Sequence, residues 1–598
     1  MASATPASLP SPLAFLQPEQ LPTRRRTQSV DGLERSPAET SLLSGAQDPL
    51  QLAKAGSPSA IANRPFQPGR PGGEAPADPI LGQLNLTLAG GPPQAEISAS
   101  VGIGGRFFVL SIGGGNTLQV SEATDPANPT LLTRQDLGPV DTGTVATFGN
   151  LVAVGLSPAG YRQATSLDEM RGLVRFFRLG ADGSLTFLED VPVGFLPDGM
   201  AFNANGTKLV IANEGEANWG PEAADGSFPE AYSVDPVGSI GIIDITARGR
   251  SNPNFRYTDL GFEGLALPAG LRLTGPAGTT AAQDIEPEYV TIVGNTAFVS
   301  LQENNGIARV NLATNTIEGI FDLGRIDYTQ VTVDISDQDG PGGSRLINPQ
   351  RLPADRRFFG LRMPDGIDAF SQQNGLFVLT ANEGDSRIYP DVEDQELYSD
   401  EERSRRYAES LYRRLKTLDD TGNPDERVNS DTSFGSRSIS LFDGLTGQLL
   451  WDSGDALQNI AIALGQYDDG RSDDKGVEPE AVVNWQDPVT GRRYAIAAPE
   501  RTILGDNKTF LAIFDITDQD RSPRTYRVKD DAFVTALEIA GSEAAEGLLV
   551  VPASQSPTGR DMLMLSNEGS STVDFLDLGA MVRQPWTRGS INATYLFG

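Results

Sequence analysis

The chain has 598 residues, of which 38% are hydrophobic, and a formal net charge of −32 at pH 7. Phosphate groups would repel so acidic a protein, which argues against binding to nucleic acid or to anionic membrane surfaces. Because it contains no cysteine and no histidine, disulfides, iron–sulfur clusters, Ser-His-Asp triads and the usual zinc and haem sites are excluded.

Residues 1–78 are rich in Pro, Ser, Ala and Gln, a composition typical of disordered segments. No apolar stretch follows a charged start there, so we expect no secretory signal peptide and an export route of another kind. No run of about 18 apolar residues occurs either, and no transmembrane segment is expected.

From about residue 80 onward, short β-branched and aromatic runs alternate with Gly, Asn, Asp and Pro turns. Five segments repeat one unit: a carboxylate before a strand, a turn, a second strand ending in Glu, and a third strand. Two weaker copies precede them. Repeats of about four strands, none able to bury both faces alone, are typical of propeller blades. We predict an all-β fold, a seven-bladed β-propeller of four-stranded antiparallel blades over residues 95–580. A parallel β-helix is the alternative.

Two insertions interrupt the predicted blades, at about residues 325–360 and 388–435. The second contains YSDEERSRRYAESLYRRLKTLDD, where an apolar stripe and i,i+4 charge pairs predict a helix, either a lid on one propeller face or a surface insertion without function. Residues 581–598 form a C-terminal tail. The glycines at 113–115 predict a hairpin turn and not a phosphate loop, because no helix follows, and no nucleotide is expected.

The repeated carboxylates occupy two kinds of position. One set opens the first strand of a blade and the other ends its second strand. These positions are neighbours in an antiparallel hairpin, so we expect both sets at one mouth of the channel. The first set is Asp198, Glu288, Asp365, Glu480 and Glu546; the second is Glu214, Glu303, Glu383, Glu500 and Glu568.

Two interpretations of these carboxylates remain open. So many negative charges would repel one another, and calcium or magnesium, which take oxygen ligands, would relieve that repulsion. Alternatively, each carboxylate caps backbone N–H groups or pairs with an arginine in its own blade, as a structural clasp.

Further acidic and basic residues extend the candidate site. Asp334, Asp337 and Asp339 in DISDQDGPGG resemble a calcium loop, although a solvated acidic turn would look the same. YDDGRSDDKG at 467–476 is a second such loop, which turn chemistry alone would explain. Arg387, Lys475 and Arg501 are candidate phosphate-binding residues, or they neutralise neighbouring carboxylates.

Several motifs in order (PDGMAF with KLVIANEGE, EPEYV, DISDQDG, PDGIDAF with LFVLTANEGDSR, KGVEPEAVV, and MLMLSNEGSSTVDFLDL) resemble the choice-of-anchor I propeller family. That family is similar to the mesenchyme-specific cell-surface glycoprotein, and its bacterial members are often labelled alkaline phosphatase-like or phytase-like. The resemblance covers about residues 95–580. It implies an extracellular or surface-anchored propeller.

The phytase-like label implies calcium held by carboxylates at one mouth and hydrolysis of phosphoesters. A metal-dependent phosphoester hydrolase is therefore one expected function, with divalent cations and a phosphoester as partners. The alternative is a non-enzymatic surface or matrix propeller that uses cations for rigidity and binds a partner for adhesion. No catalytic nucleophile is identified in the sequence.

Overall fold

The computed structural model describes residues 78–87, 94–218, 232–248, 253–275, 278–354, 357–373, 375–389, 398–399, 401–403, 414–418, 430–520, 526–583 and 591–592. The segment predicted to be disordered lies, except for Asp78, outside these residues. The same holds for most of the predicted C-terminal tail.

Seven antiparallel sheets of four or five strands follow one another along the chain. The first three sheets are β2–β5 (Ile97–Ile103, Arg106–Ile112, Thr117–Glu122, Thr130–Asp136), β6–β9 (Val140–Phe148, Leu151–Pro158, Arg171–Leu179, Leu185–Phe195) and β10–β13 (Pro197–Phe202, Lys208–Asn213, Ser239–Thr246, Asn254–Gly261). The fourth is β14–β17 (Val290–Val293, Thr296–Leu301, Gly306–Asn311, Thr316–Asp322).

The fifth sheet contains β20 (Ile367–Gln372), β21 (Gly375–Asn382), β27 (Ser438–Asp443) and β28 (Leu449–Asp452). The sixth contains β29 (Pro479–Gln486), β30 (Arg493–Pro499), β31 (Lys508–Asp515), β32 (Phe533–Ala540) and β36 (Ile591–Asn592). The seventh contains β33 (Ala545–Val551), β34 (Met562–Asn567), β35 (Thr572–Asp577) and β1 (Ile80–Asn85).

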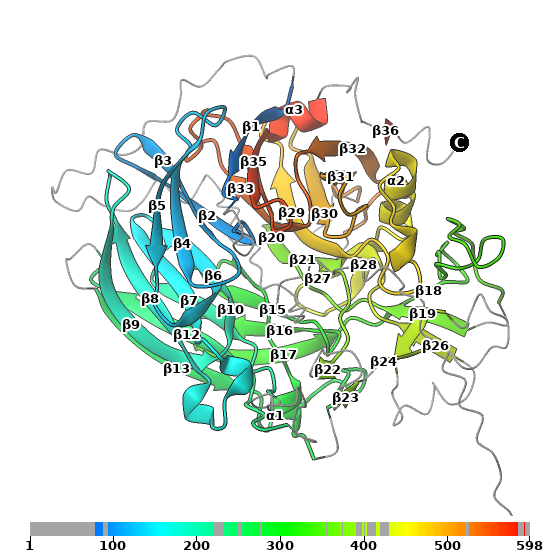
Figure 1. Ribbon diagram of the computed structural model, residues 1–598, viewed down its shortest axis with the longest axis horizontal. Coiled ribbons are helices and arrows are strands. Elements are labelled where there is room, and N and C mark those ends of the chain that lie inside the picture. Colours follow the sequence, from blue (N-terminus) through cyan, green and yellow to red (C-terminus); the bar gives the residue numbers. More distant parts are fainter. Residues whose placement is uncertain are drawn as a thin grey trace, which may run out of the picture.

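The first strands of these sheets surround a common centre in chain order (Figure 1). Strand β2 contacts β6, and contacts continue through β10, β14, β20, β29 and β33 back to β2. The predicted all-β propeller is therefore confirmed.

The ring is completed by a strand that the sequence did not reveal. Strand β1 lies before the predicted start of the propeller at residue 95, yet it pairs antiparallel with β35 as the outer strand of the seventh sheet. Figure 1 shows this dark blue strand beside the red strands from the other end of the chain. The seventh sheet thus combines the first described strand with three strands from near the other end of the described chain.

The hydrophobic core lies between neighbouring sheets. Each of seven large apolar clusters takes its members from two adjacent sheets, the last joining the seventh sheet to the first. Most inner strands are therefore covered on both faces, which explains their nearly continuous apolar sequences. Strand β30, for example, is buried along its whole length. This packing holds the ends of the inner strands at fixed positions around the centre.

The remaining elements lie outside the seven sheets. Strands β18 (Arg325–Asp327), β19 (Arg357–Leu361) and β26 (Ser430–Ser433) form a small sheet, and β22 (Ile388–Tyr389) pairs with β23 (Tyr398–Ser399). The described residues contain three α-helices: α1 (Ala281–Asp284), α2 (Ala456–Leu464) and α3 (Leu578–Arg583).

The helix predicted in the second insertion is wrong at both of its ends. Strand β24 (Glu401–Arg403) pairs antiparallel with β25 (Lys416–Leu418), so these residues form a β-ladder. Residues 404–413 lie outside the described residues. Helical charge pairs contribute only about 0.2–0.5 kcal/mol each, whereas Leu415 and Leu418 are buried against other parts of the insertions. Burial of these leucines outweighs the local helical preference.

Candidate functional site

Each residue of the Asn-Glu-Gly motif has its own role at the end of a second strand. The Asn213 and Asn382 amides donate to serine hydroxyls on the neighbouring third strand, Ser239 and Ser438 respectively. Gly215 and Gly384 have φ angles of 76° and 85°, which favour glycine. The glutamate between them is left to face the start of the first strand. The repeated asparagine and glycine therefore have structural roles, whereas the role of the repeated glutamate depends on its carboxylate.

The backbone before the first strand is strained in the same way in four of the seven sheets. Leu196, Met363, Glu478 and Ala544 all have φ between 46° and 51°, and each lies two residues before a predicted carboxylate. Residues other than glycine adopt this conformation at a cost of about 1–3 kcal/mol. The carbonyls of Leu196, Glu478 and Ala544 accept the amide N–H of Glu214, Glu500 and Glu568 respectively. This hydrogen bond joins the two carboxylate positions of a blade, as the antiparallel hairpin predicted.

The carboxylate that opens a first strand occurs in all seven sheets. The five predicted members are buried, with 0–2% of each residue exposed. Sequence reasoning missed two partly buried members, Glu96 directly before β2 and Asp141 in β6. Their sequences, AEIS and VDTG, carry the same carboxylate-before-strand signal in the two weak repeats. Of the second set, Glu303, Glu383 and Glu500 are buried, Glu214 is 9% exposed, and Glu568 is partly exposed.

The carboxylates of the third and fourth sheets raise one another's pKa. Burial, followed by the charges of Asp198 and Glu216, raises the pKa of Glu214 well above its usual value. Burial and the charges of Glu303 and Glu214 do the same for Glu288. Both carboxylate oxygens of Glu288 are buried and accept no hydrogen bond. A backbone clasp therefore does not explain Glu288.

The seventh sheet shows the same property. Glu546 is fully buried, and neither of its carboxylate oxygens has a hydrogen-bond donor. Burial and the charges of Glu480, Glu500, Glu568 and Glu96 raise its pKa well above the usual value. Because these charges all act on Glu546, carboxylates of the first, sixth and seventh sheets lie close together at one end of the ring.

The tightest group joins the fifth and sixth sheets. Carboxylate oxygens of Asp365, Glu383 and Glu480 all lie within 4.8 Å of one another, and all three residues are buried. The Tyr289 hydroxyl donates to Glu480 Oε1 at 3.3 Å, whereas Oε2 has no donor. Burial and Glu383 raise the pKa of Glu480 to about 8, although Asp365 lies within hydrogen-bonding contact. Two carboxyl groups in such contact need a shared proton or a cation between them.

A second group shares Glu383 with this one. Oxygens of Glu383, Glu478 and Glu500 also lie within 4.8 Å of one another. Here the protein supplies its own positive charge: Lys475 Nζ lies 2.9 Å from Glu383, and Arg501 Nη2 lies 2.8 Å from Glu500. Burial still raises the pKa of Glu500 well above its usual value, despite Arg501.

The three candidate phosphate-binding residues all contact carboxylates. Arg387 is 2% exposed and its guanidinium contacts Asp284 at 2.5 Å and Glu286 at 2.9 Å. Lys475 also reaches Asp385 at 3.1 Å, and Arg501 lies 3.6 Å from Glu478. Neutralisation of acidic neighbours, one of the two expectations, is thus observed for all three. Their phosphate-binding role stays a prediction.

Sequence reasoning also missed the first glutamate of each Glu-Pro-Glu motif. Glu286 is held by Arg387, and Glu478 forms two hydrogen bonds of 2.7 and 2.8 Å with Arg471. In both motifs the first glutamate takes an arginine, and the second, Glu288 or Glu480, keeps at least one oxygen without a donor. The duplicated Glu-Pro-Glu sequence was the signal that could have drawn attention to the first glutamate of each motif.

The three aspartates of the first acidic loop separate into two environments. Asp337 forms two hydrogen bonds with Arg414, at 2.8 and 3.0 Å, and so has a fixed cation of its own. Asp334 and Asp339 lie beside Asp469 of the second acidic loop. The two loops, far apart in the sequence, are neighbours in the structure.

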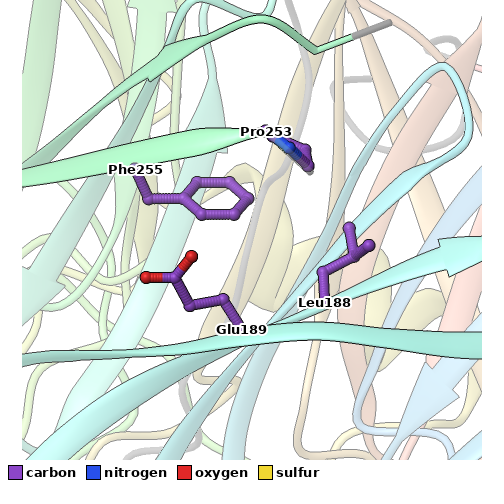
Figure 2. A pocket seen from close by; sticks show the side chains of 4 residues that line it. All are labelled: Leu188, Glu189, Pro253 and Phe255. Carbon is purple, nitrogen blue, oxygen red and sulfur yellow. The ribbon is translucent and has the colours of Figure 1, made fainter. Parts of the chain in front are cut away.

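The structure also has a pocket on the outer rim. Leu188, Glu189, Pro253 and Phe255 line a cavity of about 200 Å³ between β9 and β13 (Figure 2). Apart from Glu189 it offers only apolar and ring side chains, and none of the predicted site residues lines it.

The donor set at the inner strands fits a hard divalent cation. It consists of carboxylate oxygens, the ligands that calcium and magnesium prefer, and it lacks the nitrogen and sulfur ligands of zinc, haem and iron–sulfur sites. The buried oxygens without donors on Glu288, Glu480 and Glu546 are the observation that supports this fit. Calcium accepts six to eight oxygen ligands in a flexible geometry, whereas magnesium requires a nearly ideal octahedron. An irregular set of carboxylates therefore suits calcium better than magnesium.

None of the helices in the described part of the chain is long and apolar enough to cross a membrane. No curated protein matches the chain. Among solved structures, it is similar to hydrazine synthase of Kuenenia stuttgartiensis, with 11% identity, a TM-score of 0.39, and coverage of 79% of this chain and 93% of the other. It is also similar to a Bacteroides uniformis protein designated a candidate 6-phosphogluconolactonase, with 12% identity, a TM-score of 0.37, and coverage of 79% and 92%.

The sequence profile of the choice-of-anchor I domain matches residues 96–519, which include the first six sheets apart from the end of the sixth. Carboxylates of several motifs that suggested this resemblance, such as Asp198, Glu288 and Glu480, lie at the starts of first strands in these sheets. The chain belongs to the choice-of-anchor I domain family.

Proposed function

We propose that this protein is a surface-anchored, extracellular propeller that binds calcium at the mouth formed by its inner strands. One observation carries the proposal: Glu288, Glu480 and Glu546 are buried, and their carboxylates keep oxygens without a donor. Leaving such groups unpaired is costly, because burial removes water and the neighbouring charges repel them. A bound cation would supply the missing partner.

The residues that would hold calcium are those whose oxygens already converge. Asp365, Glu383 and Glu480 are the best-defined set, and Glu288 with Glu214, Glu303 and Asp198 forms the next. Bound calcium would neutralise these carboxylates and could bind oxygen atoms of a ligand. Surface location is supported by the family, whose name refers to alternative anchors.

Calcium binding can be tested by removing divalent ions and adding calcium back. Glu480→Gln and Glu288→Gln keep the side-chain shape but weaken cation binding. We expect each to reduce the calcium-dependent rise in Tm, measured by calorimetry, whereas Glu318→Gln, at a partly exposed outer-strand residue paired with Arg309, keeps the full rise. An unchanged response in both mouth variants would overturn the proposal.

Phosphoester hydrolysis is the second candidate function, and one observation favours it. Lys475 and Arg501 lie against the carboxylates of the fifth and sixth sheets, so phosphate oxygens arriving there would meet both cationic groups. Arg387 is less suited, because it is only 2% exposed, whereas Lys475 is 7% exposed and Arg501 is partly exposed. The alternative is a non-enzymatic surface or matrix propeller that binds a partner.

A turnover assay separates these alternatives. The calcium-loaded protein is incubated with a phosphomonoester and a phosphodiester, and released phosphate or alcohol is measured, with Arg501→Gln as the matched variant. Calcium-dependent turnover that falls in Arg501→Gln supports hydrolysis. Calcium-dependent stabilisation without turnover on either ester supports the non-enzymatic propeller.

A further inference from the structure

Two acidic loops outside the mouth meet beside the three-stranded sheet. One contains Asp334 and Asp339 and follows β18; the other contains Asp469 and precedes β29. Arg437 joins them through backbone carbonyls: its Nη1 donates to Asp334 O at 2.6 Å, and its Nη2 donates to Ser472 O at 2.9 Å. Because this arginine uses its N–H groups on carbonyls, it leaves the nearby carboxylates without hydrogen bonds from it.

The three aspartates are neighbours in this region. Asp334 and Asp469 lie within hydrogen-bonding contact of each other, and the charge of Asp339 acts on both. Asp334 is 1% exposed and Asp469 is 7% exposed. Oδ1 of Asp334 and both carboxylate oxygens of Asp339 and Asp469 are buried and have no hydrogen-bond donor. These three residues thus carry five buried acceptor atoms that have no hydrogen-bond donor.

The positive groups around these aspartates offset their charge only in part: Arg437 lowers the pKa of Asp334 and Arg345 lowers that of Asp469, yet both pKa values stay raised by burial. Arg345 lies 3.4 Å from Asp468, the neighbour of Asp469, and is exposed, and Arg414 is held by Asp337. The hydroxyl of Tyr467 and Nε2 of Gln458 also lack partners, and Gln458 Oε1 accepts the N–H of Asp334 at 3.0 Å. Burial and the charges of Asp334 and Asp339 raise the pKa of Asp469 to about 7. So many unmatched polar atoms in one place indicate a missing polar partner.

We propose that Asp334, Asp339 and Asp469 together bind one calcium ion, separate from the mouth, that joins the two loops. Carboxylates on loops form the adaptable oxygen shell that calcium accepts, and water would complete it. Asp337 and Asp468 are excluded from the ligand set because arginines hold them. This inference does not depend on the proposed mouth site, since no residue is common to both.

The second loop gives this ion a structural role. Besides Asp469 it carries Arg471 and Lys475, which contact Glu478 and Glu383 at the mouth. Calcium held by Asp469 would fix the loop from its outer side. The ion would therefore hold the cationic residues of the mouth in place.

The test counts bound calcium in the full-length protein. After equilibrium dialysis against calcium chloride, calcium per protein is measured for wild type, Asp334→Asn, Asp469→Asn and the control Asp337→Asn, with Glu480→Gln as the mouth variant. Asp334→Asn and Asp469→Asn are each expected to bind one calcium fewer than Asp337→Asn. Glu480→Gln is expected to keep the loop ion. Calcium counts in both loop variants equal to that of the control would overturn the proposal.

Terbium luminescence provides a second readout, which detects the bound ion directly and not through the calcium count. Terbium replaces calcium, and Tyr467, which is buried beside Asp334 and Asp469, can transfer excitation to it. Tyr467→Phe is expected to lower tyrosine-sensitised emission severalfold without changing the calcium count. The less buried variant Asp339→Asn is expected to lower the same emission. Unchanged emission in both variants would contradict a metal ion at this place.

Discussion

At the residue scale, the two glutamates of one Glu-Pro-Glu motif have opposite acidities. Glu478 and Glu480 are both fully buried. Burial raises the pKa of Glu478, but Arg471, Lys475 and Arg501 outweigh it and leave the pKa below its usual value. Burial and Glu383 raise the pKa of Glu480 to about 8. Two residues of separation therefore decide whether a carboxylate is neutralised by the protein or needs another partner.

This difference predicts how stability depends on pH. An unfolded glutamate has a pKa of about 4.3, so between about pH 4 and 8 the folded state keeps the Glu480 proton that the unfolded state has released. The folded state then binds more protons, and the free energy of unfolding falls as pH rises through this range. Without divalent ions, we expect Tm to fall between pH 5 and 9, and Glu480→Gln to reduce that fall.

Calcium should stabilise the folded protein most at high pH, where the protein without calcium is least stable. Cation binding requires ionised carboxylates, so calcium is expected to raise Tm more at pH 9 than at pH 5. Calorimetry across the pH series, with and without calcium, measures both effects. A wild-type Tm that does not vary with pH, or a calcium effect that is larger at pH 5, would contradict the assignment of Glu480.

At the element scale, the repeat predicted most strands but not every element. Alternating turns and apolar runs, and a glutamate after each second strand, were enough to place β10, β11, β20 and β21. The helical stripe failed at β24 and β25, because burial of Leu415 and Leu418 was not visible in local periodicity. The spacing of apolar residues describes one segment of the chain, whereas burial depends on neighbours far away in the sequence.

The first strands also approach one another unusually closely, and this predicts a role for one glycine. Gly366 follows Asp365, and its N–H donates to the carbonyl oxygen of Glu480 at 3.0 Å. A Cβ at Gly366 would lie 2.4 Å from that oxygen, so two blades would have to separate. We expect Gly366→Ala to lower the free energy of unfolding by about 1–3 kcal/mol.

Gly319 offers the matched control, because an added Cβ there meets no atom within 4 Å. It lies in the outer strand β17. Denaturant unfolding compares the two alanine variants. If both lose the same stability, close packing of the first strands is not the cause.

At the scale of the whole molecule, the sequence predicted which carboxylates gather, but not which of them are neutralised. The repeat predicts that these carboxylates gather, because equivalent positions of the repeated sheets lie at the same end of the ring. The opposing cations come from distant segments: Arg387 reaches Glu286 across 101 positions, and Lys475 reaches Glu383 across 92. No local spacing encodes such pairs. Glu288 and Glu546 were therefore indistinguishable from Glu383 before the structure was known.

Closure of the ring by β1 leads to a prediction about truncation. Leu84 and Leu86 are buried between the seventh and first sheets, and burial of a leucine contributes about 1.5–3 kcal/mol. A chain that begins at Gln94 should therefore be less stable than one that begins at Asp78 by at least the contribution of these leucines. The shorter chain also exposes the edge of β35, which favours aggregation. Calorimetry and light scattering compare the two chains, and equal Tm values would contradict a stabilising role for β1.

The same pairing has a consequence for biosynthesis. Ile80 leaves the ribosome long before its partner Leu576 has been made. The first five sheets can form as they emerge, while β1 has to wait for β35 before the seventh sheet is complete. Until then the nascent protein keeps an open ring, in which the buried carboxylates of neighbouring sheets have not all been brought together. Docking of β33 between the sixth and the first sheet is thus the step that both closes the ring and completes the acidic mouth.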